Sequence, residues 1–320
     1  MNDHNSDTIF IAVPALNEYF LEVTVADAYK KAKDPSKIYF GIFNQKTEGN
    51  EFENFSDYPN VKSVNISYKE PLGVGLARLG SSTLHDQQEY FLQIDAHTIF
   101  CKDWDAILVE DFKQLKKYCD KPLISQSVAW HGEEVYCDPE KQYINNFAGE
   151  KAYPLCTKED GLSTNADTSR EDEEKIFGKF LEHYLCFGCA GVFGDAKFLY
   201  DVSYNPFVPF NPEQELTALR ASTRGYRFFS SEKTVMSTLS KNEELGFTKE
   251  KYSDDRVFAF NGYLESRKIY GNWGHDYLYG KKFGFWGAEN KEQYDEYVKK
   301  SNNNFEENDK KYHNRKEKLR

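Results

Sequence analysis

Apolar and polar positions divide the first part of the chain into short strands and longer helices. Residues 8–13, 37–43 and 90–94 are apolar runs with β-branched and aromatic side chains, a pattern typical of buried strands, and residues 61–66 alternate as in a half-buried strand. Residues 20–32 and 104–118 carry apolar side chains at helical spacing, and we expect a further helix at 76–84. This alternation predicts a Rossmann-like α/β unit within residues 1–122.

The pattern becomes less regular after residue 122. We expect strands at 123–130, 185–193, 226–229 and 233–236, and helices at 195–200 and 213–225. Residues 157–175 are acidic, rich in Ser and Thr and almost free of apolar side chains, which favours a long loop. From residue 253 the chain is predicted to be helical and increasingly charged. We therefore divide it into residues 1–122, a second half at 123–250, and a helical C-terminal extension at 251–320.

The composition indicates a folded protein outside the membrane. Hydrophobic residues make up 39% of the 320 residues, and 25 Phe and 22 Tyr make this fraction aromatic. The longest apolar run, residues 9–15, is far shorter than the roughly 20 residues that a membrane span needs. Residues 1–7 lack the basic and apolar regions of a signal peptide, so we expect a cytoplasmic protein.

Charge and cysteine content narrow the function classes. The formal net charge of −11 means that the surface as a whole repels phosphate, which argues against non-specific nucleic-acid binding. A phosphate-bearing substrate would therefore need a local cation. Cys186 and Cys189 form a Cys-x-x-Cys pair with no second pair at zinc-finger spacing, so we expect free thiols rather than a structural zinc site.

A carboxylate and an imidazole follow the strand predicted at 90–94. Asp95 and His97 are separated by one residue, and ligands usually bind outside the carboxyl ends of the strands in an open α/β sheet. An oxygen and a nitrogen ligand suit a divalent ion such as Mn²⁺, or Mg²⁺, and leave positions open for substrate oxygens. The tripeptide alone is equally compatible with a helix-capping Asp and a surface His.

Several motifs follow one another in order through the chain. They are Pro14-Ala-Leu-Asn17-Glu18, Gln45, Gly73-x-x-x-Ala77-Arg78, Gln93-Ile-Asp95-Ala-His97, Gly188-Cys-Ala-Gly191, Asn205-Pro206, and Glu213-Gln through Arg220 to Gly225-Tyr226. In this ordered set, over roughly residues 8–236, the chain resembles the family typified by the cytoplasmic hydroxyproline N-acetylglucosaminyltransferase. The set as a whole is more specific than any one of its motifs.

This resemblance implies a GT-A fold, a UDP-sugar donor and a divalent cation held by Asp95 and His97. Residues 1–122 would then bind the nucleotide sugar, and residues 123–250 would form the acceptor side of the same domain. Arg78 would lie beside the diphosphate, where its planar guanidinium group suits phosphate oxygens. The alternative is that Arg78 is an ordinary exposed cation on a helix. The residues implied to cradle uracil and ribose are Pro14, Asn17, Glu18 and Gln45.

Two carboxylates are candidates for the catalytic base. Glu213 and Glu215 stand at the start of a predicted helix after a Pro-rich loop, and one of them could deprotonate an acceptor hydroxyl. The alternative is that both are first-turn residues favoured by the helix dipole. The family pattern has two adjacent Glu here, whereas the second position in this chain is Gln214.

A third metal ligand is missing from its usual place. The family pattern has a His after the last core strand, where this chain has Ser237 and Thr238. His275, in a segment rich in Gly and aromatic residues, is the best replacement.

Two functions follow from this set of residues. The first is transfer of a sugar from a UDP-sugar to a hydroxyl group on a protein, a glycan or, with less support, a modified nucleobase. The second is a catalytically silent GT-A domain that binds a nucleotide sugar or a protein partner, which the missing His and the Gln at 214 would favour.

Overall fold

A computed structural model describes residues 7–69, 72–125, 129–130, 176–183, 191–206, 213–231, 235–238 and 288–301. Several predicted features lie outside these ranges: the loop at 157–175, the pair Cys186 and Cys189, and His275. Within the described residues, no helix is long and apolar enough to cross a membrane.

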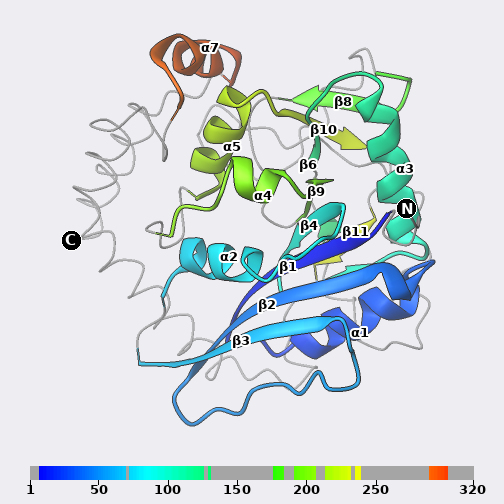
Figure 1. Cartoon of the computed structure of the whole chain (residues 1–320), viewed down its shortest axis with the longest axis vertical. Helices are drawn as coiled ribbons and strands as arrows, with labels where there is room; N and C mark the ends of the chain where they lie inside the picture. Colours follow the sequence, from blue (N-terminus) through cyan, green and yellow to red (C-terminus); the bar gives the residue numbers. More distant parts are fainter. Residues whose placement is uncertain are drawn as a thin grey trace.

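The described strands form a central eight-stranded mixed sheet in the order β3-β2-β1-β4-β9-β6-β10-β8. Its first half is parallel and consists of β1 (Ile9–Leu16), β2 (Ile38–Thr47), β3 (Val61–Tyr68) and β4 (Tyr90–Ile94). The second half contains β6 (Pro122–Ser125), β8 (Phe180–His183), β9 (Gly191–Asp195) and β10 (Arg227–Ser231). Strand β9 joins the halves, because it pairs antiparallel with both β4 and β6 (Figure 1).

Helices cover both faces of this sheet because side chains alternate along the buried strands. Ile9, Ile11 and Val13 of β1 pack in one apolar cluster with α1 (Leu21–Lys31) and α3 (Trp104–Lys116). Phe10 and Ala12 point to the opposite cluster. That cluster contains residues of α4 (Phe198–Asp201), α5 (Glu213–Thr223) and α7 (Lys291–Ser301).

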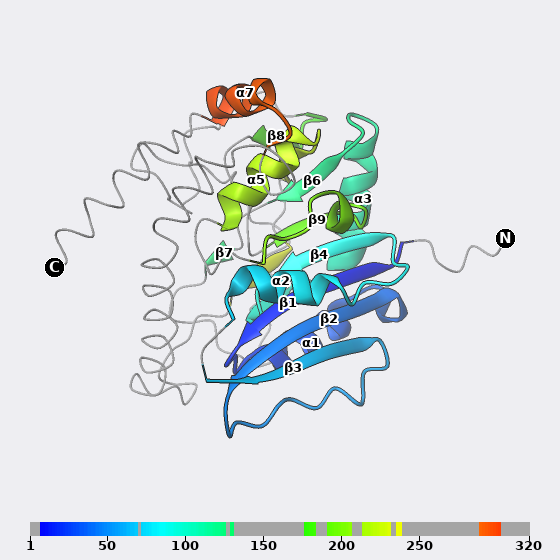
Figure 2. The ribbon, with the colours of Figure 1, turned by 60° about the vertical axis from the view of Figure 1, so that its left-hand side comes forward.

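Helix α2 (Val74–Ser82) lies against β1 and β2 on the same side as α4 and α5 (Figure 2). Its close approach depends on Gly80, where an added Cβ would come within 2.2 Å of the Phe43 ring of β2. The helix therefore carries its side chains close to the carboxyl ends of the central strands. A 3₁₀ turn, η1 (Pro35–Lys37), precedes β2.

A three-stranded sheet lies beyond the end of β4. Strand β5 (Thr98–Phe100) pairs antiparallel with β11 (Met236–Thr238), and β11 pairs parallel with β7 (Ala129–Trp130). This small sheet brings residues 236–238 beside the segment that follows β4, although more than a hundred positions separate them in the sequence.

The structure differs from the sequence prediction in several elements, among them β5, which was not expected, and the following three. The single strand expected at 123–130 is split between β6 of the large sheet and β7 of the small one. Pro14 lies inside β1 rather than ending it. The pairing of β1 with β4 covers only Ile9 to Ala12, so the side of β1 that faces β4 needs no N–H donor at Pro14. Strand β8 was not expected, since its short segment lacks a strong alternating pattern.

Candidate functional site

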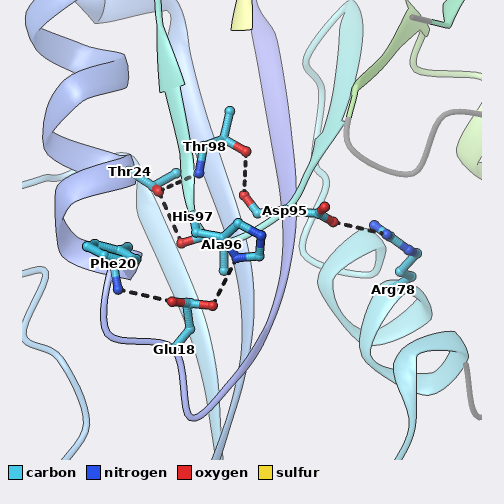
Figure 3. Close-up of polar contacts among 8 residues, drawn as sticks. All are labelled: Glu18, Phe20, Thr24, Arg78, Asp95, Ala96, His97 and Thr98. Atoms are coloured by element: carbon cyan, nitrogen blue, oxygen red, sulfur yellow. Dashed lines mark hydrogen bonds and ion pairs between the residues drawn. The ribbon is translucent and has the colours of Figure 1, made fainter. Parts of the chain in front are cut away.

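The turn between β4 and β5 contains Asp95, Ala96 and His97 and is held by helix α1. The Thr24 hydroxyl donates to the Ala96 carbonyl at 3.0 Å and accepts the Thr98 N–H at 3.0 Å (Figure 3). Thr98 in turn donates its hydroxyl to the Asp95 carbonyl at 2.8 Å. Because Thr24 is fully buried, these bonds are shielded from water and fix the backbone between the two candidate ligands.

A second buried contact of α1 supports the strand after this turn. Asp27 accepts the Phe100 N–H at 2.8 Å and lies 2.6 Å from Lys31. Burial lowers the pKa of Lys31 from its ordinary value, and the neighbouring Asp27 opposes that effect. Sequence reasoning missed Thr24 and Asp27 as supports of the site. Their signal was available, since both are polar residues on the face of α1 that carries Leu21, Val25 and Ala28.

On one side of the turn, His97 meets Glu18 from the loop between β1 and α1. Nδ1 of His97 lies 2.9 Å from Oε2 of Glu18, and Oε1 of Glu18 accepts the Phe20 N–H at 3.2 Å. Figure 3 shows the carboxylate beneath the ring, with one oxygen directed to each partner. We call Glu18 and His97 the imidazole side of the site.

On the other side, Asp95 meets Arg78 from α2. Nη2 of Arg78 lies 3.5 Å from Oδ1 of Asp95, and Nε of Arg78 lies 3.0 Å from Oε1 of Glu213 at the start of α5. Arg78 is only 2% exposed, and two carboxylates offset the cost of burying its charge. We call Arg78, Asp95 and Glu213 the guanidinium side. The guanidinium side thus joins α2 and the turn after β4, in the first half of the fold, to α5 in the second half.

The other residues expected near the nucleotide come together where β1 and β2 end. Asn17 adopts a left-handed backbone conformation (φ 45°), and its side chain bonds to Thr47 and Tyr68 at 2.8 to 2.9 Å. The Asn17 N–H donates to the Gln45 carbonyl, while the side-chain oxygen of Gln45 accepts the Leu72 N–H at 2.8 Å. Pro14 lies on β1 opposite Phe43. Their contact with a nucleotide stays a prediction.

The remaining expected residues are distributed differently. Glu215 belongs to α5, but its side chain is not among those described, and His275 lies outside the described ranges. Ser237 and Thr238 occupy β11, where Thr238 pairs with Thr98. Positions 237 and 238, near which the family pattern has its His, therefore lie on the strand beside Thr98, the residue after His97.

Within the described residues, no three His, Cys, Asp or Glu side chains gather as a potential metal site. Asp95 and His97 nevertheless provide a donor set that fits a divalent ion. The Asp95 side chain is 30% exposed and the His97 side chain 27%, so both reach the surface of the turn. Because Nδ1 of His97 contacts Glu18, a metal bond to this ring would use Nε2.

Comparison with known structures shows which proteins share the fold of this chain. GalNAc-T7, crystallised with UDP, GalNAc and Mn²⁺, is 14% identical over 94% of this chain, with a TM-score of 0.53. The match spans 55% of the GalNAc-T7 chain, so this chain corresponds to about half of that protein. Staphylococcus aureus TarS, in a complex of its residues 1–349 with UDP-GlcNAc, is 12% identical, with 91% of this chain and 79% of that chain covered and a TM-score of 0.47. No curated protein matches the sequence.

The mixed α/β sheet with its flanking helices is a GT-A fold, as the sequence predicted. The sequence profile described as glycosyltransferase (GlcNAc) matches residues 52–253, which is more than half of the chain. The chain therefore belongs to the glycosyltransferase (GlcNAc) family.

Proposed function

We propose that this protein is a metal-dependent glycosyltransferase that moves a sugar from a UDP-sugar to a hydroxyl group. The observation that carries the proposal is the turn after β4, which contains both Asp95 and His97. Asp95 contacts the buried Arg78, and His97 contacts the buried Glu18. Family membership supports the reaction class. The location of the turn, outside the carboxyl end of a central strand, is where open α/β sheets bind ligands.

Asp95 and His97 would hold the divalent cation. When bound, such an ion supplies positive charge that stabilises a departing diphosphate. Arg78, buried against Asp95, keeps that carboxylate oriented and adds a cation to a chain whose net charge is −11. Asn17 and Gln45 hold the ends of β1 and β2 together, which supports a rigid floor for the nucleotide.

The transfer needs one bond exchange and one proton acceptor. The bond between the anomeric carbon and the β-phosphate oxygen breaks, the acceptor oxygen bonds to that carbon, and UDP leaves with the bonding electrons. The acceptor proton passes to a carboxylate at the start of α5, Glu213 or Glu215. Glu213 contacts Arg78, so replacing each Glu by Gln separately distinguishes a base from a residue that positions Arg78.

The donor and acceptor can be narrowed by chemistry. The family description names GlcNAc, which makes UDP-GlcNAc the first donor to test, with Mn²⁺ as the cation because GalNAc-T7 was crystallised with it. For the acceptor, the net charge of −11 favours a protein or glycan hydroxyl over nucleic acid. The resemblance in the sequence motifs makes a hydroxyproline peptide the first acceptor to try.

A catalytically silent domain is the second candidate, favoured by Ser237 and Thr238 at the place of the family's His. Titration of the chain with UDP and Mn²⁺, together with a donor-hydrolysis assay, separates the two. Binding with release of UDP supports the transferase, and binding without turnover supports the silent domain. A chain that shows no metal-dependent UDP binding would exclude the proposed transferase and a nucleotide-sugar-binding domain.

A further inference from the structure

We infer that Glu18 is a positioning residue that holds His97 with its proton on Nδ1, so that Nε2 is the atom directed to the cation. This inference rests on the proposed function, because it concerns the same metal site. It assigns Glu18 a different role from the one implied by family resemblance, in which Glu18 contacts the uracil or ribose.

The first step is the chemistry of the hydrogen bond. An ionised carboxylate only accepts hydrogen bonds, so if Glu18 is ionised, its contact of 2.9 Å between Oε2 and Nδ1 of His97 places the proton on Nδ1. A neutral imidazole protonated on Nδ1 has its lone pair on Nε2. A carboxylate behind a metal-binding His fixes both the tautomer and the ring orientation in this way.

The second step is that Glu18 is itself held in place. Its other oxygen, Oε1, accepts the N–H of Phe20, which directly precedes α1. The preceding residue, Asn17, is tied to β2 and β3 through Thr47 and Tyr68. Each oxygen of the carboxylate therefore has a donor, one from the backbone and one from the imidazole.

Exposure separates this role from a direct nucleotide contact. The side chain of Glu18 is 6% exposed, whereas that of His97 is 27% exposed. The imidazole is thus the member of the pair that can meet a ligand, and Figure 3 shows the carboxylate beneath it.

The wild-type chain provides the first test. Selective ¹⁵N labelling of histidine, with the His97 signals assigned by comparison with His97→Ala, reports which ring nitrogen carries the proton. We expect Nδ1 to be protonated in the metal-free protein. A neutral His97 protonated on Nε2 would overturn the inference without any variant of Glu18.

Glu18→Gln provides the second test. The amide offers one acceptor and one donor, so it cannot accept both from Phe20 and from His97. If its oxygen keeps the Phe20 N–H, its NH₂ group faces Nδ1 and selects the opposite tautomer. We expect the dissociation constant for Mn²⁺, measured by titration in the presence of UDP, to rise by about 10- to 100-fold. The affinity for UDP in EDTA should be unchanged.

Glu22→Gln is the matched control, because Glu22 is an exposed residue in the first turn of α1 and the substitution removes the same charge. It should bind Mn²⁺ like the wild type. Equal Mn²⁺ affinity in Glu18→Gln, or a loss of UDP affinity in EDTA, would overturn the positioning role. If the wild type itself bound no Mn²⁺, the proposed function would fail instead, and with it the metal-directed part of this inference. The tautomer measurement would then still decide the geometry of the pair.

Discussion

The two sides of the turn after β4 both pair a nitrogen-containing side chain with a carboxylate, but they differ in which parts of the chain they connect. On the imidazole side, a carboxylate three residues before α1 contacts a ring three residues after β4, and the supporting hydrogen bonds given above lie within residues 17–98. On the guanidinium side, Arg78 contacts both Asp95 and Glu213, which are separated by more than a hundred residues. The first side orients one ring, whereas the second links α2, on the first half of the sheet, to α5, on the second half.

This difference teaches how the parts of the site should respond to mutation. A change on the imidazole side should alter metal affinity with little effect on folding, because its contacts stabilise a local turn. Removing the Arg78 cation on the guanidinium side should reduce stability, because this nearly buried charge links α2 to α5.

The largest expected effect is on activity and follows from Asp95→Ala, which removes the carboxylate common to the proposed metal site and the guanidinium side. We expect turnover to fall by at least about 1,000-fold, since the charge stabilisation lost is worth several kcal/mol. The melting temperature should change little, because the side chain is 30% exposed. Release of UDP from UDP-GlcNAc measures this, with the exposed Asp57→Ala as control. Retained activity would show that the metal site lies elsewhere.

The next effect is on stability. Arg78→Met removes the cation 3.0 Å from Glu213, whose side chain is 6% exposed, and should lower the free energy of unfolding by about 3–5 kcal/mol. The double variant Arg78→Met/Glu213→Leu should recover most of the loss, because it removes the buried charge as well. Urea unfolding measures both. A loss below about 1 kcal/mol, typical of exposed ion pairs, would contradict the link between the halves.

Thr24→Val tests the support shared by both sides. The substitution keeps the shape but leaves the Ala96 carbonyl and the Thr98 N–H without the Thr24 hydroxyl. We expect a loss of about 2 kcal/mol in the free energy of unfolding, the cost of unsatisfied buried polar groups. Thr83→Val, at an exposed position after α2, should stay within about 0.5 kcal/mol of wild type. Equal melting curves for the two variants would argue against a role of Thr24 in fixing the turn.

The smallest effect is expected from Tyr68→Phe, which weakens the hold on Asn17, the residue before Glu18 of the imidazole side. It removes the hydroxyl that accepts from Asn17 at 2.8 Å, while the bonds between Asn17 and Thr47 remain. The expected cost is about 0.5–1.5 kcal/mol in urea unfolding, the range for one hydrogen bond. Tyr58→Phe is the control, because the Tyr58 ring is stacked on Tyr29 and the substitution keeps that ring. If Tyr68→Phe cost no more than this control, the hydrogen bond from Asn17 to Tyr68 would not stabilise this region.

Much of the fold could be predicted because strong local patterns coincide with buried elements. The apolar run at 90–94 corresponds to β4, whose five residues are all buried, and the helical spacing at 104–118 corresponds to α3. Residues 123–130 failed as a single strand because an apolar run does not indicate which sheet each part joins. Strand β8 was missed because its short segment lacks a strong alternating pattern, and it is held in place by β10, a partner more than forty residues away.

For the site, the sequence by itself determined the chemical groups and their order: a carboxylate and an imidazole directly after a buried strand, a cation at 78 and carboxylates at 213 and 215. The tertiary structure alone decided their partners. Glu18 turned toward His97, and Arg78 reached both Asp95 and Glu213, because sheet pairing and helix packing bring together side chains far apart in the chain. Hydrogen bonds and ion pairs act over a few ångströms, and sequence spacing fixes such distances only within one element.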